Sequence, residues 1–320
     1  MGISDDEALS GKVFTVLGGS GFFGRHLAQE LLSRGARLRV ACRNPQRAFA
    51  LKPLGNLGQI AFVRCDATKP ASLVSAFAGS DAVVNLVGAF DGDLDAVQGV
   101  GAGKVAKAAA EAGAGIFVHV SAIGADAASR IDYSRTKAEG EAAVSAAFPG
   151  AVIVRPSLLF GQDDNFVHMF ARLIAAFPVL PVFSPQARLQ PVFVDDAAAA
   201  VASILADPVK HSGKTFELGG PEVITMLELN QRIAAAQGRN RLFLELPDGV
   251  SAAFAAMTGW LPGAPISADQ FALLKAGSVA LDKRPGFKQL GIAPRPLSLF
   301  LKRWMVRYRK HGRFGPAQRA

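Results

Sequence analysis

Tyr133 and Lys137 form a Tyr-x-x-x-Lys pattern at the start of a predicted helix. The spacing of four residues places both side chains on one face of that helix. A tyrosine near its ordinary pKa of about 10 is a poor acid or base at neutral pH, and a nearby cation lowers that pKa. We therefore predict that Lys137 activates the phenol of Tyr133 for proton transfer, with the Ser121 hydroxyl donating to a substrate carbonyl. The alternative is a surface pair without a catalytic role.

The segment Gly18–Gly24 indicates the cofactor for such a reaction, because Gly18, Gly21 and Gly24 form the pattern G-x-x-G-x-x-G. The first two glycines allow a tight turn and the approach of a pyrophosphate, and the third allows close helix–strand packing. The amino end of the following helix offers N–H groups to phosphate. Because the segment follows a predicted strand and opens a predicted helix, it predicts a dinucleotide site. The alternative is a turn that binds no ligand.

Arg43 indicates which dinucleotide is bound. NAD sites usually carry a carboxylate near the end of the second strand, but no acidic residue occurs between Glu30 and Asp66 in this chain. Arg43 stands at the strand end instead, and a guanidinium binds phosphate through paired hydrogen bonds. We therefore predict NADPH, with Arg43 on its 2′-phosphate. The alternative is a solvated charge at a strand end.

Other residues of the site are expected where the remaining strands end, because ligands of open α/β sheets bind at the carboxyl ends of the strands. The ammonium of Lys137 is expected on the nicotinamide ribose. The predicted cofactor-binding residues are Gly18, Gly21, Phe22, Phe23, Gly24, Arg43, Asp66, Ala67, Leu86, Val87, Gly88, Tyr133, Lys137 and Pro156; the predicted catalytic residues are Tyr133, Lys137 and Ser121. The five histidines are too scattered for a metal site, and His119 is expected in the core.

The elements that must position these residues are short apolar runs that alternate with helical patterns. Strands are predicted over residues 13–17, 38–42, 60–65, 82–87, 116–120 and 152–156, with helices that include 22–34 and 93–112. Most of the runs are apolar on both faces, as in a parallel sheet that helices cover on each side. Repeated βα units predict an α/β fold with a doubly wound parallel sheet, the Rossmann arrangement.

A smaller second domain is predicted to interrupt and follow the first. We assign residues 1–162 and 191–220 to the dinucleotide-binding domain. Residues 163–190 and 221–320 form a smaller, discontinuous, α-rich C-terminal domain, because the chain there is helical, loop-rich and punctuated by proline.

The net charge of +9 is concentrated near the carboxyl end. No acidic residue follows Asp282, whereas eleven of the 35 basic residues do, which leaves 24 basic and 26 acidic residues in the rest of the chain. A local excess favours contact with an anionic lipid surface or an acidic partner rather than nucleic acid. The tail 296–320 carries an apolar stripe at helical spacing (Leu297, Phe300, Leu301, Trp304, Met305 and Tyr308). This predicts an amphipathic helix, either at a membrane interface or packed on the second domain.

Composition excludes several other classes of protein. Half of the residues are hydrophobic, including 22 Phe, which excludes a disordered chain. The two cysteines, Cys42 and Cys65, lie in apolar runs and are expected as buried thiols rather than a disulfide. No apolar stretch reaches the roughly 20 residues of a membrane-spanning helix. Acidic residues near the start, without an apolar core, argue against a signal peptide.

Together these motifs resemble the short-chain dehydrogenase/reductase superfamily, in its extended or atypical branch, with Arg155-Pro156 and Gly161 resembling the signature of the sixth strand. More narrowly, the chain is similar to the nucleotide-binding accessory subunit of respiratory complex I, of the alpha-subcomplex subunit nine type. The segments that carry this second resemblance are Gly18–Gly24, Arg43, Asn85–Gly88, Tyr133–Glu141 and residues 191–196.

The resemblance implies a tightly held, structural NADPH at the junction of the hydrophilic arm and the membrane of complex I. It implies other complex I subunits as partners and a peripheral place on the cytoplasmic side of a bacterial inner membrane. Two features depart from it: Tyr133 and Lys137 are both present, and Ser121 lies closer to Tyr133 than the extended branch usually has it. The alternatives are an independent NADP-dependent reductase, epimerase or dehydratase acting on a quinone precursor or a nucleotide sugar, and a redox-sensing regulator.

Overall fold

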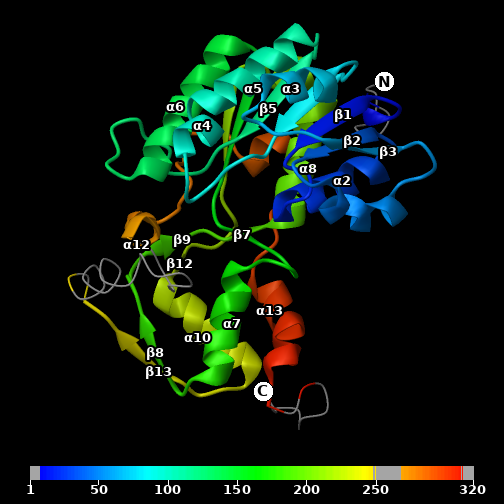
Figure 1. The fold of residues 1–320 in the computed structure, drawn as a ribbon. Helices are drawn as coiled ribbons and strands as arrows, with labels where there is room; N and C mark the ends of the chain where they lie inside the picture. Colours follow the sequence, from blue (N-terminus) through cyan, green and yellow to red (C-terminus); the bar gives the residue numbers. More distant parts are fainter. Residues whose placement is uncertain (1–7, 248, 250–267, 311, 313–320) are drawn as a thin grey trace. The chain divides into compact units, whose positions relative to one another are not determined.

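The computed structural model describes residues 8–247, 249, 268–310 and 312, and the chain divides into two compact units (Figure 1). The first unit comprises Met1–Pro156, Val194–Leu218 and Ala280–Ala293, and the second unit comprises the rest. The segment Ala280–Ala293 packs with the first unit, whereas the sequence analysis placed it in the smaller domain. Its neighbour there is the strand β11 (Thr215–Leu218), because Glu217 N–H donates to the carbonyl of Pro285 over 2.9 Å.

The first unit is built on a seven-stranded parallel sheet in the order β11-β6-β5-β4-β1-β2-β3. Its elements are β1 (Val13–Leu17), α2 (Phe22–Ser33), β2 (Arg37–Cys42), the 3-10 helix η1 (Pro45–Leu54), β3 (Ile60–Arg64), α3 (Pro70–Phe77), β4 (Ala82–Asn85), α4 (Leu94–Gln98), α5 (Val100–Glu111), β5 (Ile116–Val120), α6 (Asp132–Ala147), β6 (Val152–Pro156), α8 (Val194–Ala206), α9 (Pro208–His211), β11 (Thr215–Leu218) and η2 (Phe287–Leu290). The predicted doubly wound sheet is confirmed. The strand order reverses between β1 and β4, which is where such folds bind ligands.

One predicted helix is wrong in its length. Residues 93–112 form two helices, α4 and α5, which are separated at Gly99 (φ −84°, ψ −113°). A side chain at Gly99 would displace the carboxylate of Asp95, whose Oδ1 accepts from the N–H of Val100 over 3.1 Å at this break. The break turns the fully buried side chain of Gln98 toward α6, where its Nε2 donates to Thr136 Oγ1 over 3.0 Å. The fourth strand also ends earlier than predicted, at Asn85 rather than at residue 87.

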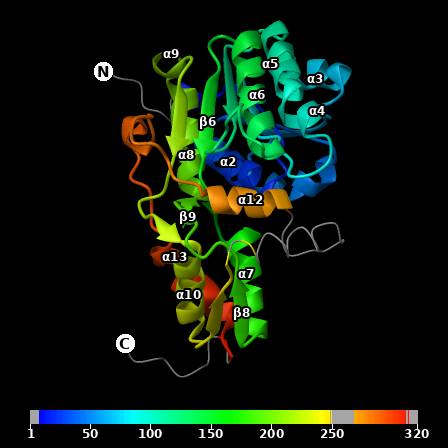
Figure 2. The same ribbon diagram turned by 90° about the vertical axis from the view of Figure 1, so that its left-hand side faces the viewer.

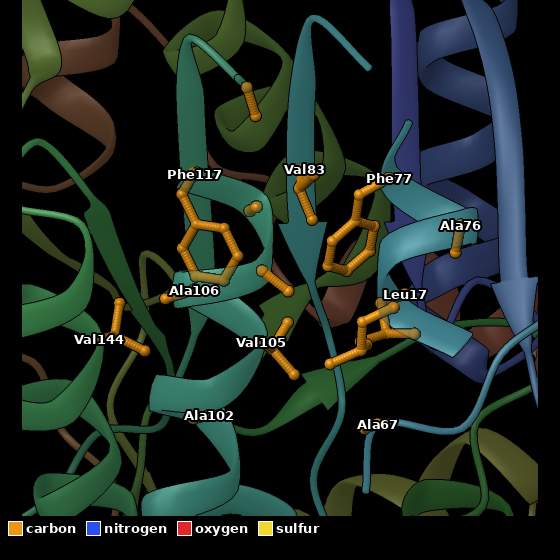
Figure 3. Packing of buried hydrophobic residues seen from close by; sticks show 14 of the residues in the cluster. Leu17, Ala67, Ala76, Phe77, Val83, Ala102, Val105, Ala106, Phe117 and Val144 are labelled. Carbon is orange, nitrogen blue, oxygen red and sulfur yellow. The ribbon is translucent and has the colours of Figure 1, made fainter. Parts of the chain in front are cut away.

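Apolar layers on both faces of the sheet hold the first unit together. Phe77 from α3, Val105 from α5 and Phe117 from β5 belong to one continuous buried cluster (Figure 3). On the other face, α2 packs beside α8, and His26 Nδ1 lies 2.5 Å from Asp195 Oδ1. Because both faces are covered, strands that are apolar on both sides are stable here, as the sequence predicted.

A buried ion cluster joins α6 to the edge of the sheet. Arg155 on β6 donates to both carboxylate oxygens of Glu141 on α6, over 2.6 and 2.9 Å. Its third nitrogen lies 3.2 Å from Glu217 on β11, whose other oxygen accepts from the N–H of Leu281 over 2.8 Å. The three charged side chains are 14%, 11% and 3% exposed. These interactions raise the pKa of Arg155, with its hydrogen bond to Glu141 as the main cause.

The second unit contains short strand pairs and helices (Figure 2). Its elements are β7 (Leu159–Phe160), α7 (Phe166–Ala176), β8 (Val179–Val182), β9 (Arg188–Leu189), β10 (Val192–Phe193), β12 (Ile224–Thr225), α10 (Met226–Gln237), β13 (Leu242–Glu245), α12 (Ala268–Ala276), α13 (Ser298–Trp304) and η3 (Met305–Tyr308). Helix α10 packs beside α7 and begins with a capping box in which Thr225 and Glu228 bond each other's backbone N–H groups.

The apolar stripe of the tail packs inside the second unit. Phe300 stacks on Phe193 at a ring-centroid distance of 4.2 Å and on Trp304 at 4.9 Å. Leu301, Trp304 and Met305 are buried. Of the two readings of the stripe, the structure therefore supports internal packing, and residues 311 and 313–320 of the predicted tail lie outside the described residues. Among the residues described, no helix is both long and apolar enough to cross a bilayer.

Candidate functional site

The glycine segment turns from β1 into α2 at the carboxyl edge of the sheet. Gly18 has a φ of +84°, a conformation that L side chains rarely adopt, and Gly21 N–H donates to its carbonyl over 3.0 Å. A Cβ at Gly24 would lie 2.5 Å from Gly19 Cα, so the helix can approach the turn only with glycine at this position. Gly21 caps α2 without a side chain, so the first N–H groups of the helix, from Phe22, Phe23 and Gly24, are left for an anion. The turn thus has the shape and the polarity of a pyrophosphate cradle.

A shallow pocket of about 440 Å³ opens beside this turn, after β2. Its lining residues are Arg43, Asn44, Pro45, Gln46, Phe49 and Arg64. Two guanidinium groups and no carboxylate line it, so the pocket suits a phosphate group. Gly18 N–H donates to the carbonyl of Ala41, two residues before Arg43, over 2.9 Å, which places the pocket next to the glycine segment. The sequence analysis missed Arg64, because only the pairing of β3 with β2 brings it beside Arg43.

Asp66 and Ala67 follow β3, but the carboxylate of Asp66 is engaged in its own turn. It accepts from the N–H and the hydroxyl of Thr68 over 3.1 and 2.8 Å. The pKa of Asp66 is lowered, first by these hydrogen bonds and further by Lys69 and Arg43. A direct contact of this carboxylate with a nucleotide would compete with the turn, whereas Ala67 is a small buried residue at the same strand end.

The segment after β4 brings the other predicted residues together. Leu86 N–H donates to the carbonyl of Leu17 over 3.0 Å, and a Cβ at Gly18 would lie 3.4 Å from Leu86 and 3.5 Å from Val87. Gly88 lies next to Lys137, whose Nζ would be 3.1 Å from a Cβ at that glycine. The carboxyl ends of β1 and β4 and the start of α6 therefore meet at one place, as the sequence predicted for ligand-binding strand ends.

Lys137 is almost completely buried at this meeting point. Its Nζ donates to the carbonyl of Val120 at the end of β5 over 3.3 Å. Burial lowers the pKa of Lys137 to about 8, partly opposed by the carboxylate of Glu141 one turn further along α6. An ammonium held at this depth can bind the hydroxyl groups of a ribose.

Tyr133 differs from the expectation in its acidity. Burial raises the pKa of Tyr133 to about 12, whereas the sequence analysis expected Lys137 to lower it. The reason is geometric, because the ammonium lies 5.8 Å from the centre of the ring and bonds Val120 instead. A parallel aromatic ring, Phe90, stacks on Tyr133 at a centroid distance of 4.7 Å.

Ser121 and His119 carry buried polar atoms without a partner. Ser121 directly follows Val120, is 4% exposed, and its Oγ has no hydrogen-bond partner. That orphaned hydroxyl is available to a carbonyl group of a ligand. His119 lies in the core, as predicted, with its Nδ1 3.2 Å from the amide nitrogen of Asn85. Burial, with a contribution from Lys137, lowers the pKa of His119 to about 3, so the imidazole is neutral.

Pro156 closes the same edge at the end of β6, where its carbonyl accepts from Ile123 N–H over 3.1 Å.

The sequence analysis missed two further residues, Gln98 and Phe90. Gln98 accepts from Ala89 N–H over 3.1 Å and so holds the loop that carries Phe90. Gly140 was the available signal, because a side chain there would collide with the carbonyl of Gln98. Within the described part of the chain, no three His, Cys, Asp or Glu side chains gather as metal ligands would.

Replacing Lys137 by methionine is expected to stabilise the folded protein by about 2 kcal/mol at neutral pH. A pKa lowered from 10.5 to about 8 costs about 3 kcal/mol while the lysine is charged, and the lost hydrogen bond to Val120 offsets about 1 kcal/mol of the gain. Between pH 8 and 10.5 the unfolded state binds more protons than the folded state. Wild-type stability therefore rises over this window, and the advantage of the variant shrinks.

Denaturant midpoints at about pH 7 and about pH 10 measure this effect. The matched control is Lys104→Met, which removes an exposed lysine from α5 and should change stability by less than about 0.5 kcal/mol at either pH. An advantage of Lys137→Met that stays constant with pH would contradict the assignment of the cost to the buried ammonium.

Comparison with known proteins places this chain in a family. Residues 18–168 match the family model described as NAD(P)H-binding, so the first unit contains an NAD(P)H-binding domain; residues 128–256 match the RmlD substrate binding domain. The mitochondrial NADH dehydrogenase (ubiquinone) 1 alpha subcomplex subunit 9 of Arabidopsis thaliana is 31% identical over 332 residues, which cover 97% of this chain and 81% of that protein. This chain belongs to the alpha subcomplex subunit 9 family. The resemblance seen in the sequence motifs is thereby confirmed.

Proteins named as reductases are also similar to this chain. A ceramide reductase from Caulobacter vibrioides is 31% identical to this chain over 253 residues, 78% of each protein. Among solved structures, an NADPH-dependent quinone oxidoreductase from Escherichia coli, in complex with NADPH, superposes with a TM-score of 0.74 at 20% identity, over 91% of this chain and 99% of that one. At that identity the structural likeness shows the fold alone.

Proposed function

We propose that this chain is an NADPH-binding accessory subunit of respiratory complex I and that the nucleotide is a structural cofactor. The observation that carries the proposal is the 31% identity to a complex I subunit, which extends over 97% of the chain and so through both units. A relation confined to the nucleotide-binding domain would support only nucleotide binding. A relation that includes the second unit supports a shared place in an assembly.

The first unit offers partners for the pyrophosphate, the 2′-phosphate and the nicotinamide ribose of NADPH. The turn Gly18–Gly24 and the amino end of α2 would hold the pyrophosphate, Arg43 and Arg64 the 2′-phosphate, and Lys137 the nicotinamide ribose. The two arginines in one pocket are what favours NADPH over NADH. A bound nicotinamide supplies hydride chemistry, but in this proposal the chain's residues only bind and orient it.

The second unit would supply the docking surface. The tail exposes Lys302 and Arg303 on α13, Arg307 on η3 and Lys310 after η3 ends, whereas Leu301, Trp304 and Met305 are buried. Such exposed basic residues attract anionic lipid headgroups or acidic protein surfaces, at about 1 kcal/mol for each basic residue near an anionic membrane. We place the chain on the cytoplasmic side of a bacterial inner membrane, bound to other complex I subunits where the hydrophilic arm meets the membrane.

The test is whether the chain purifies from detergent-solubilised respiratory membranes together with NADH:ubiquinone oxidoreductase activity and with NADPH bound. Deleting the tail would also remove Trp304 and Met305 from the interior of the second unit, so the docking variant is Lys302→Gln with Arg303→Gln and Arg307→Gln. We expect this variant to leave the membrane fraction while keeping its nucleotide. A wild-type chain that purifies alone and free of the respiratory enzyme would contradict the proposal.

A second candidate function is an independent NADPH-dependent carbonyl reductase. Two observations favour it: the orphaned hydroxyl of Ser121 lies next to the carbonyl that Lys137 bonds, and a ceramide reductase is 31% identical over 78% of the chain. Tyr133→Phe separates the candidates. It should leave respiratory NADH oxidation unchanged if the nucleotide is structural, whereas accumulation of a lipid carbonyl compound in the mutant would support the reductase.

A further inference from the structure

The loop between β4 and α4 places Phe90 directly on Tyr133. The two rings are nearly parallel, with an interplanar angle of 9° and centroids 4.7 Å apart. Phe90 itself is 59% exposed, so its other side faces solvent. A substrate that receives a proton from Tyr133 has to approach the phenol, and Phe90 already occupies one face of that ring.

The position of Phe90 is fixed by a buried connection to the same helix. Ala89 N–H donates to Gln98 Oε1 over 3.1 Å, and Gln98 Nε2 donates to Thr136 Oγ1 over 3.0 Å. Thr136 in turn donates to the carbonyl of Asp132, over 2.7 Å, in the turn of α6 that holds Tyr133. Because Gln98 is completely buried, this connection excludes water and resists opening. Hydrogen bonds through Gln98 therefore link the loop to the turn of α6 that holds Tyr133.

The charged groups near Tyr133 are engaged with partners other than its phenol. Lys137 bonds Val120, and Arg135 on the same turn is paired with Asp132 over 2.7 Å and with Glu139 over 2.9 Å. Desolvation is the dominant influence on the phenol, since burial raises its pKa to about 12. A phenol in that state is a weak proton donor at neutral pH.

We propose that Phe90 is a specificity-determining residue that shields Tyr133 from substrates, so that the chain keeps a Tyr-x-x-x-Lys pair and yet holds its nucleotide without turnover. This inference rests on the proposed structural role of NADPH, because it explains how a chain with the residues of a reductase can serve that role. Phe90 acts on Tyr133 by covering it, and it touches no reacting atom.

Titration of the phenol tests the inference without an enzyme assay. The chain has two tyrosines, so a Tyr308→Phe background leaves Tyr133 as the only one, and phenolate absorbance then reports its ionisation alone. Phe90→Ala is expected to lower the titration midpoint by about one pH unit or more, toward the ordinary value of about 10. The larger phenolate fraction and the open face should speed nitration of Tyr133 by tetranitromethane at least about tenfold.

The matched control is Phe177→Ala, which removes another exposed phenylalanine, 54% exposed, at the end of α7 in the second unit. It should leave both the midpoint and the nitration rate of Tyr133 unchanged. Because Phe90 is largely exposed, its loss should not unfold the chain, and far-ultraviolet circular dichroism of each variant verifies this. An unchanged midpoint and nitration rate in folded Phe90→Ala would overturn the inference.

Nucleotide retention through gel filtration, measured on the same samples, keeps the two proposals apart. Retained NADPH together with an unaltered Tyr133 titration in Phe90→Ala overturns the shield and leaves the structural cofactor standing. Loss of NADPH from the wild type, together with a shifted titration in the variant, overturns the structural cofactor while the covering of Tyr133 by Phe90 holds.

Discussion

Replacing Arg43 by glutamine is expected to weaken NADPH binding by about 10- to 100-fold and to leave NADH binding within about twofold. Hydrogen bonds between charged partners contribute about 1.5–3 kcal/mol, and only NADPH carries the 2′-phosphate that would receive them. The Arg43 side chain lines the pocket beside the glycine turn rather than packing in the core, so its loss should not disturb the fold. Titration of reduced-nicotinamide fluorescence at one fixed salt concentration measures both constants.

Two further variants make this result specific. Arg64→Gln should also weaken NADPH binding selectively, because Arg64 lines the same pocket. Arg37→Gln removes an exposed arginine at the opposite end of β2 and should have no selective effect. Equal affinity of the wild-type protein for the two nucleotides would remove the argument for a 2′-phosphate site.

The sheet could be predicted because the sequence of each strand reflects the burial of both of its faces. The runs at β1, β5 and β6 were predicted with their observed bounds, since a strand covered on both faces is apolar at most of its positions and ends where polar or glycine residues begin. The break at Gly99 could not be predicted in this way. The residue before the break, Gln98, meets α6, which lies far along the chain and where a side chain at residue 140 would collide with the Gln98 carbonyl.

The residues of the candidate site differ in the same way, because local sequence patterns indicate some of them and only contacts between distant segments indicate the others. Gly18, Gly24 and Lys137 were predicted as site residues because short patterns encode them, and the structure brings their elements to one edge. Arg64 and Phe90 carry no pattern of their own, since a charge at a strand end and a phenylalanine in a loop are common. Their importance arises only from the pairing of strands and from the connection through buried side chains.

The acidity of Tyr133 depends on a contact of Lys137 that the Tyr-x-x-x-Lys pattern does not encode. The pattern Tyr-x-x-x-Lys correctly places both residues on one helix, but it does not specify which atom the ammonium bonds. Here the carbonyl of Val120 takes that position, and desolvation determines the pKa of the phenol. The tail gives a parallel case, because its periodicity was predicted, whereas the partner of its apolar stripe proved to be the aromatic cluster of its own unit.

Replacing Arg155 by methionine is expected to lower the free energy of unfolding by about 3–5 kcal/mol. The change leaves the carboxylates of Glu141 and Glu217 buried near each other without the cation that neutralises them, and uncompensated buried charges carry this cost. The loss should also loosen α6, which holds Tyr133 and Lys137, from the sheet. Urea denaturation with unchanged slope measures the difference.

The comparison with an exposed ion pair decides whether burial is the cause. Arg232 and Glu222 approach within 2.6 Å, as Arg155 and Glu141 do, but both side chains are more than one-third exposed. Arg232→Met should therefore cost no more than about 1 kcal/mol. Adding Glu141→Gln and Glu217→Gln to Arg155→Met should restore much of the stability, because the buried charges are then removed together. If Arg155→Met costs no more than Arg232→Met, water must reach the cluster, and the arginine of the Arg155-Pro156 motif would serve something other than the attachment of α6.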